Sequence, residues 1–168
     1  MIQRIQSFYL VLAAVCIVLL FMFPIAIYSG ADMTSELNLI PKESVTSPDG
    51  LTTTFLGQEG FIHTWPLMVI AILTGAITLV SIFLYKNRVR QMRWVALAFL
   101  LCVLYIFLVF FWATEAYTKH IAYLFSAAPE VSYSVGTWTP IVAAVLLFLA
   151  QRAIRKDEMK VRAADRLR

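Results

Sequence analysis

Four long apolar runs, separated by polar segments, set the pattern of the chain. The runs at residues 8–28, 66–85 and 94–114 contain no Asp, Glu, Lys or Arg, and a fourth is placed at residues 137–154. About 20 helical residues cross the ~30 Å hydrocarbon core of a membrane, where unpaired backbone groups are costly. The first run exceeds the roughly 7–15 apolar residues of a signal peptide, so we expect it to remain as an anchor. The pattern therefore predicts an all-α fold, a four-helix transmembrane bundle in which residues 1–168 form a single transmembrane domain.

The segment after the first run, residues 29–65, is the largest part expected outside the membrane. It contains Ser47-Pro48-Asp49-Gly50, where proline presets φ and glycine accepts a positive φ, so that a turn is favoured. Residues 37–40 and 51–56 flank this turn, and the second stretch carries three threonines. A small β-hairpin in this outer loop is one expectation, and an irregular loop is the other.

Charge asymmetry orients the predicted bundle. Residues 29–65 hold five acidic residues against Lys42 alone, whereas residues 86–93 hold four basic residues and no acid. The tail at residues 152–168 holds seven basic and three acidic residues and is rich in helix formers, so we expect a cytoplasmic helix. Because Lys and Arg collect on the cytoplasmic side, both termini are expected there. The basic tail has two interpretations, a plain topology signal or attraction to anionic lipid.

Composition supports a membrane protein. The chain is 61% hydrophobic and 14% charged, with a mean hydropathy of +0.79. Soluble domains average roughly 45–50% apolar and about 25% charged residues. These values exclude a water-soluble globule and intrinsic disorder, and two cysteines are too few for a disulfide-stapled domain. The net charge of +4 follows from topology, so we expect no nucleic-acid partner.

Little ionisable chemistry lies within the predicted spans. No His and no charged residue falls inside them before Arg152, which argues against an ion pump and against a haem held by two histidines. Cys16 and Cys102 are expected to be inert packing residues, because the outer loops carry no cysteine. Four residues near the outer surface are potential metal ligands, namely Glu59, His63, Glu115 and His120. No tight spacing links them, so we expect hydrated side chains at these positions and no metal site. We therefore expect no enzyme and no cofactor, with Glu115 pairing to Lys119.

One face of the second run carries small and polar residues at helical spacing, which are Ala71, Thr74, Thr78, Ser81 and Tyr85, with Gly75 beside them. The helix-packing residues expected from this small-polar stripe, together with one residue of the third run, are Ala71, Thr74, Gly75, Thr78, Ser81 and Tyr105. Small residues let helices approach and hydroxyls bond between them, so the stripe should face protein, with Ile72, Leu79 and Phe83 toward lipid. A buried phenol needs a partner, and Thr74 or Thr78 is the first candidate for Tyr105. Alternatively, each threonine bonds its own i−4 carbonyl and Tyr105 bonds another backbone oxygen.

The opening decapeptide, M-I-Q-R-I-Q-S-F-Y-L at residues 1–10, resembles that of a family of small four-span membrane proteins from Bacteroidota. The likeness extends over the whole chain in length and in the order of spans. That family has no known activity, so the resemblance implies a bacterial inner (cytoplasmic) membrane and transfers no catalytic residue. The four-span plan is also similar to claudin-like proteins, although the tryptophan and paired cysteines of their first outer loop are absent from residues 29–64.

These observations favour a non-catalytic subunit or scaffold of a membrane assembly, with the lipid bilayer and other membrane proteins as partners. The alternative is a small transporter or lipid-handling protein. A transporter needs a discontinuous helix or buried polar groups near the midplane, so the presence of a polar cavity discriminates between the two functions.

Overall fold

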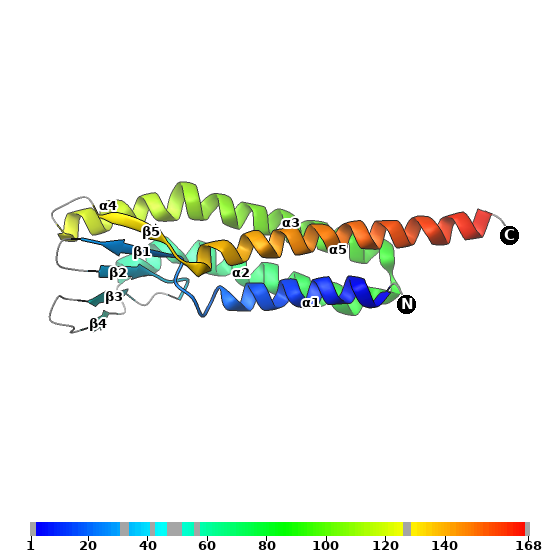
Figure 1. The fold of residues 1–168 in the computed structure, drawn as a ribbon, viewed down its shortest axis with the longest axis horizontal. Helices are drawn as coiled ribbons and strands as arrows, with labels where there is room; N and C mark the ends of the chain where they lie inside the picture. The colour runs from blue at the N-terminus through cyan, green and yellow to red at the C-terminus, as the bar shows by residue number, and fades with distance from the viewer. Residues whose placement is uncertain are drawn as a thin grey trace.

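The molecule is elongated, with helices along its length and a small sheet at one end (Figure 1). The computed structural model describes residues 3–30, 34–40, 43–46, 52–55, 58–125 and 129–166. The N- and C-termini lie at the end of the bundle opposite the sheet (Figure 1). We refer to the two ends as the sheet end and the terminal end.

Long helices form the bundle. They are α1 (Gln3–Leu19), α2 (Gln58–Phe83), α3 (Arg88–Leu108), α4 (Thr114–Phe125) and α5 (Val135–Arg166). A 3₁₀ turn, η1 (Leu84–Lys86), joins α2 to α3, and a π-helical turn, η2 (Val109–Ala113), makes α3 and α4 one continuous rod. Within the described residues, three helical segments are long and apolar enough to cross a membrane: Thr64–Phe83, Arg88–Lys119 and Val135–Val161. The apolar part of α1, Gln6–Leu19, is shorter.

The prediction of one helix over residues 8–28 is wrong at its end toward the sheet. The helix ends at Leu19, and a turn follows in which the amide of Phe21 donates to the carbonyl of Val18 at 3.0 Å. Pro24 then offers no N–H and disfavours helical geometry in the residue before it. The chain leaves this turn as a β-strand, β1 (Ala26–Ser29), whose backbone groups are paired in the sheet instead.

The other three predicted runs lie within helices that are longer than expected. The helix containing residues 94–114 continues through η2 into α4. The helix containing residues 137–154 continues to Arg166, so the helical tail is confirmed over its described part. Pro140 lies inside α5 and cannot bond the Gly136 carbonyl four residues earlier. The Thr139 hydroxyl donates to that oxygen at 3.0 Å instead.

A five-stranded antiparallel sheet corrects the all-α prediction. Besides β1 it contains β2 (Thr34–Leu37), β3 (Glu43–Thr46), β4 (Thr52–Phe55) and β5 (Glu130–Tyr133), in the order β4-β3-β2-β1-β5. The predicted hairpin is confirmed as β3 paired with β4, although its first strand lies at residues 43–46 and not at 37–40. The turn at residues 47–50 lies outside the described residues. The sequence did not predict β1, β2 or β5.

One face of the sheet packs toward the helices, and the other face is partly exposed. Strand pairing places Tyr28 beside Ser35 and Val131, and Ala26 beside Leu37, all on the face that packs toward the helices. Successive side chains alternate between faces. The opposite, outward face therefore carries polar and partly exposed residues: Ile27, Ser29, Thr34, Glu36, Glu130 and Ser132.

The bundle core is narrow, and its outside is apolar. Small side chains such as Ala13, Ala98, Ala143 and Ala150 are buried where α1, α3 and α5 meet. Large apolar side chains point outward along every long helix, and Phe83 is 78% exposed. In water such a surface would be an aggregation hazard, whereas in a bilayer it meets lipid. The helices therefore indicate a multi-pass membrane protein.

Candidate functional site

Two tyrosines and a serine fasten the sheet to α4. The Tyr28 hydroxyl donates to the Thr114 carbonyl at 3.2 Å, and the hydroxyls of Ser35 and Tyr117 lie 2.9 Å apart. The rings of Tyr28 and Tyr117 pack with their centroids 4.9 Å apart. Tyr28, Ser35 and Tyr117 are all buried. This tyrosine clamp (Tyr28, Ser35, Thr114 and Tyr117) holds β1 and β2 rigidly against the helical rod.

The π-helical turn directs α4 toward the sheet. Buried positions recur every four residues through the junction, at Tyr105, Val109, Ala113, Tyr117 and Ile121. An ordinary α-helix has 3.6 residues per turn, so this spacing would drift around its surface, and the wider π turn absorbs the excess. Residues 105–113 are all apolar, so the sequence gives no four-residue period that could have located this feature.

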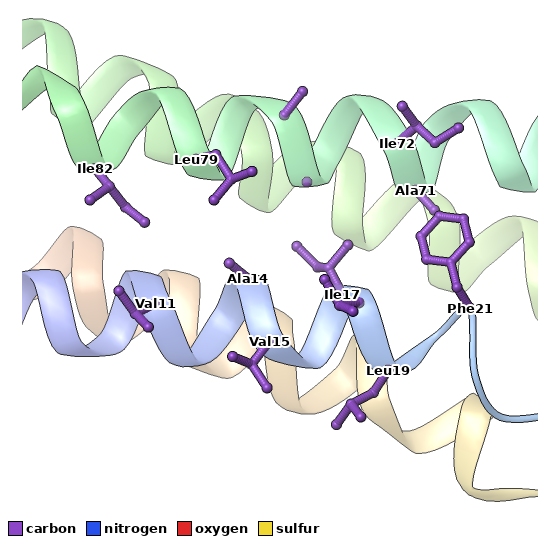
Figure 2. Close-up of a pocket in the computed structure, with 13 residues that line it drawn as sticks. Val11, Ala14, Val15, Ile17, Leu19, Phe21, Ala71, Ile72, Leu79 and Ile82 are labelled. Atoms are coloured by element: carbon purple, nitrogen blue, oxygen red, sulfur yellow. The ribbon is translucent and has the colours of Figure 1, made fainter.

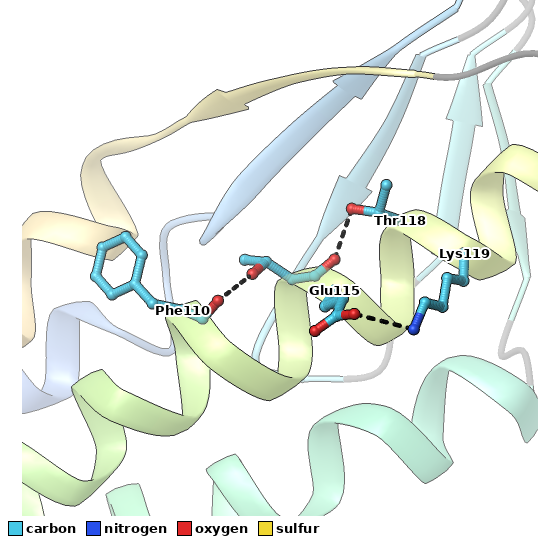
Figure 3. A network of polar contacts seen from close by, with 5 residues as sticks. Phe110, Glu115, Thr118 and Lys119 are labelled. Atoms are coloured by element: carbon cyan, nitrogen blue, oxygen red, sulfur yellow. Dashed lines mark hydrogen bonds and ion pairs between the residues drawn. The ribbon is translucent and has the colours of Figure 1, made fainter.

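Threonine hydroxyls stabilise the helix around this junction (Figure 3). Thr114 donates to the Phe110 carbonyl at 2.9 Å, and Thr118 donates to the Thr114 carbonyl at 2.6 Å. On the exposed side of α4, Lys119 Nζ lies 3.0 Å from Glu115 Oε1, which confirms the expected pair. The Thr114 carbonyl thus accepts both the Tyr28 and the Thr118 hydroxyls.

A second contact ties β1 to the start of α5. The amide of Gly136 donates to the Pro24 carbonyl at 3.1 Å, and the amide of Ser134 donates to the Ile25 carbonyl at 3.0 Å. The Thr137 hydroxyl also donates to the Ile25 carbonyl. A Cβ atom at position 136 would overlap the Pro24 backbone, so glycine is required for this backbone crossing. The sequence analysis did not identify Gly136, because the close approach depends on a segment distant in the chain.

Polar side chains near the terminal end join α1 to α5, α3 to α2, and α3 to α5. Gln6 Nε2 of α1 donates to the Ala153 carbonyl of α5 at 3.3 Å, and Gln91 Nε2 of α3 donates to the Ser81 carbonyl of α2 at 3.1 Å. Arg88 Nη1 at the start of α3 lies 3.1 Å from Asp157 Oδ2 on α5. The first turns of the tail are therefore held against the bundle.

The ion pair between Arg88 and Asp157 should stabilise the bundle measurably. The Asp157 side chain is 11% exposed and the Arg88 side chain 30%, so Asp157→Ala leaves a partly buried cation unpaired. We expect this variant to lower the free energy of unfolding by about 1–3 kcal/mol. The double variant Arg88→Asp, Asp157→Arg should recover most of the loss, because it restores the pair and places an acid at the N-terminus of α3. Thermal midpoints in detergent test this, and a swapped variant as unstable as the single one contradicts it.

The residues of the small-polar stripe are mostly buried. Ala71, Thr74, Thr78 and Ser81 are buried and Gly75 is half-buried, whereas Ile72, Leu79 and Phe83 are exposed. The prediction is wrong for Tyr85, which lies beyond the end of α2 in η1 and is 52% exposed. The stripe hydroxyls donate within α2: Thr74 to Ile70, Thr78 to Thr74 and Ser81 to Thr78, at 2.7, 2.7 and 2.6 Å. The alternative expected for the two threonines, bonding to their own i−4 carbonyls, is therefore confirmed.

Tyr105 does not form the bond predicted for it. Its side chain is buried at the centre of the bundle, and its hydroxyl has no hydrogen-bond partner among the described residues. The predictions of a bond to Thr74 or Thr78, or to another backbone oxygen, are therefore both wrong. Both cysteines are buried and free, and the Cys102 thiol contacts the Pro140 carbonyl at 3.2 Å.

An apolar groove separates α1 from α2 (Figure 2). Its volume is about 640 Å³, and every lining residue is aliphatic, aromatic or glycine. Val11 and Ile17 line it from α1, while Ala71, Gly75 and Leu79 line it from α2. The stretch of α2 along the groove, from Ala71 to Ile82, is about 16 Å long by helical rise, close to half of a ~30 Å hydrocarbon core.

The possible metal ligands near the sheet end are not brought together in the described structure. The side chains of Glu59, His63 and His120 lie outside what the structure describes. Among the described residues, no group of three or more His, Cys, Asp or Glu side chains is placed to hold a metal ion. The expectation of hydrated side chains at these positions stays a prediction, apart from the confirmed pair of Glu115 with Lys119.

The fold and these contacts define a helical membrane protein with a sheet fastened to one end of its bundle. The chain belongs to the family described as "Domain of unknown function (DUF4293)", which residues 2–167 match. This confirms the expected membership of a family of unknown function over nearly the whole chain. A comparison with curated proteins finds no match.

The tyrosine clamp makes the stability of the sheet sensitive to high pH. Burial raises the pKa of Tyr28 from about 10 to about 12. Because the folded-state pKa lies above the unfolded one, the stabilisation is complete below about pH 10 and is lost as the pH rises through about 12. Thermal midpoints across this window should fall more steeply for the native protein than for Tyr28→Phe. Identical pH profiles for the two proteins would contradict this.

Proposed function

We propose that this protein is a non-catalytic scaffold subunit of an assembly in the bacterial inner membrane. In this proposal α1, α2, the α3 rod and α5 cross the membrane, both termini lie in the cytoplasm, and the sheet lies outside. Charge supports this orientation, because exposed Arg90, Arg93, Arg152 and Arg155 gather toward the terminal end, and Arg collects on the cytoplasmic side.

The main support for the proposal is that the sheet is attached to the helical bundle at two places. The tyrosine clamp fixes one part of the sheet to α4. The backbone hydrogen bonds from Ser134 and Gly136 to Ile25 and Pro24 fix the start of β1 to α5. A sheet held at two places presents its outward face in a fixed position relative to the membrane. Glu36 and Glu130 make that face acidic, and such a preorganised surface lowers the cost of binding a partner.

Co-purification from native membranes in mild detergent, followed by mass spectrometry, tests the scaffold role. The proposal expects a stoichiometric partner that is lost from the double variant Glu36→Lys, Glu130→Lys. Glu115→Lys is a matched control, since it reverses an exposed acid on α4 away from the outward face. Native protein purified without a stoichiometric partner, or a partner retained equally by the double variant and the control, contradicts the proposal.

The groove between α1 and α2 favours the second candidate, a lipid-handling protein. Its wholly apolar lining and its length suit one acyl chain of a phospholipid. A phospholipid with a photoactivatable acyl chain should crosslink to α1 and α2, and Ala76→Phe should reduce the yield by filling the groove. Val145→Phe places the same phenylalanine side chain at an exposed site on α5 and serves as the control. Equal yields from the two variants would remove support for this candidate.

A further inference from the structure

Six exposed basic side chains lie on α3 and α5, toward the terminal end, beyond the continuous apolar surface of these two helices. On α5 the continuous exposed apolar surface ends at Phe148 and Leu149, and on α3 it begins at Trp94. Beyond these limits the exposed large apolar residues are isolated: Val89 on α3, and Met159 and Val161 on α5. The basic residues beyond these limits, which we call the basic collar, are Arg90, Arg93, Arg152, Arg155, Lys156 and Lys160.

The register of α3 against α5 places the two parts of the collar at similar depth. The two helices are antiparallel, and they touch where the Cys102 thiol meets the Pro140 carbonyl and again where Arg88 meets Asp157. Between these contacts, Arg93 and Arg90 fall near the level of Arg152 and Arg155 by helical rise. The collar therefore forms a basic patch across α3 and α5 at the terminal end, and Lys156 and Lys160 extend it along α5 by about 6 and 12 Å beyond Arg152.

The ion pair with Arg88 neutralises Asp157, which is one of the two acids near the basic collar. Asp157 and Glu158 are the only acids between residues 151 and 161. Asp157 is buried and paired with Arg88, which is not part of the collar. A simple count of charges along the tail therefore understates the positive charge that the surface presents.

The 32 residues of α5 extend about 48 Å, well beyond the ~30 Å hydrocarbon core. Arg and Lys at the boundary keep their stems along apolar surface and their charged groups in the headgroup layer. The described part of the tail thus lies where phosphate groups of the bilayer are expected, and its charge is complementary to an anionic headgroup.

We propose that the basic collar binds the headgroups of anionic phospholipids in the cytoplasmic leaflet. This inference rests on the membrane embedding proposed above, but not on the scaffold role. Juxtamembrane Lys and Arg residues attract anionic lipid roughly in proportion to their number, and salt screens the attraction over about 10 Å.

Reconstitution in nanodiscs of phosphatidylcholine and phosphatidylglycerol tests the collar, with native mass spectrometry counting the lipids retained by the released protein. We expect preferential retention of phosphatidylglycerol, reduced about tenfold in the triple variant Arg152→Gln, Arg155→Gln, Lys156→Gln. The charge-retaining variant Arg152→Lys, Arg155→Lys should behave like the native protein. Retention by the native protein should also fall as salt is raised during reconstitution, a measurement that needs no variant.

Four outcomes would overturn the inference. Equal retention of phosphatidylglycerol by the native and triple-variant proteins removes the role of the collar. Displacement of the lipid by millimolar inorganic phosphate at constant ionic strength identifies a soluble anion as the ligand instead. Failure of the native protein to enter nanodiscs refutes the membrane embedding, and with it the collar, whereas entry without lipid preference refutes the collar alone.

Discussion

Gly136→Ala is expected to lower the free energy of unfolding by at least about 3 kcal/mol. The added Cβ would lie 2.8 Å from the Phe23 carbonyl oxygen and would overlap the backbone of Pro24 still more closely. Both are backbone atoms that cannot turn aside as a side chain could. Relief requires β1 to move away from α5, which breaks the bonds from Gly136 and Thr137. A detergent-solubilised thermal unfolding series measures the effect.

Gly75→Ala is the matched control for this prediction. A Cβ at position 75 would meet Ile17 Cγ2 at 3.4 Å, an ordinary van der Waals contact at the edge of the groove. Alanine also favours the helix over glycine by about 1 kcal/mol, so this variant should be as stable as the native protein or slightly more so. If the two alanine variants lose the same stability, the backbone crossing is not what makes Gly136 necessary.

Tyr28→Ala is expected to cost about 3–5 kcal/mol and to detach the sheet from α4. The side chain is completely buried, packs against Tyr117 and donates to Thr114. Removing it leaves a cavity between β1 and the helical rod that the paired strands cannot easily fill. Tyr28→Phe keeps the ring and loses only the hydrogen bond, so about 0.5–1.5 kcal/mol is expected.

Hydrogen exchange can separate loss of the sheet from loss of the bundle in the Tyr28→Ala variant. Amides of β1 and β2 should exchange faster, while those near Ala98 and Leu147 in the core of the bundle should stay protected. Native-like protection of β1 in this variant would show that the clamp does not hold the sheet.

Hydropathy alone located the long helices, because a run of about 20 apolar residues has few other structures open to it. It failed at residues 26–28, where β1 is as apolar as the span before it. Four residues are too few for a two-residue alternation to stand out against a continuous apolar run. Pro24 is the available signal, because it follows the end of the helix and precedes β1.

The packing contacts were predictable only in part. The burial of Thr74 and Thr78 follows from helical spacing, but the direction of their hydroxyls depends on competition between the local carbonyl and Tyr105. The ion pair of Arg88 with Asp157 and the crossing at Gly136 join residues far apart in the chain. No local pattern encodes those two contacts, because they arise only when the helices pack.

Accessibility of two introduced cysteines tests the central claim, a sheet displayed outside a membrane bundle, most directly. The background is Cys16→Ala, Cys102→Ala, and the probes are Thr34→Cys on the outward face of β2 and Asn87→Cys beside η1, both exposed positions. In intact bacterial spheroplasts, a membrane-impermeant maleimide should label the Thr34→Cys protein at once. It should label the Asn87→Cys protein only after permeabilisation. Labelling of Asn87→Cys but not Thr34→Cys in intact spheroplasts, or equal labelling of both, would contradict the account.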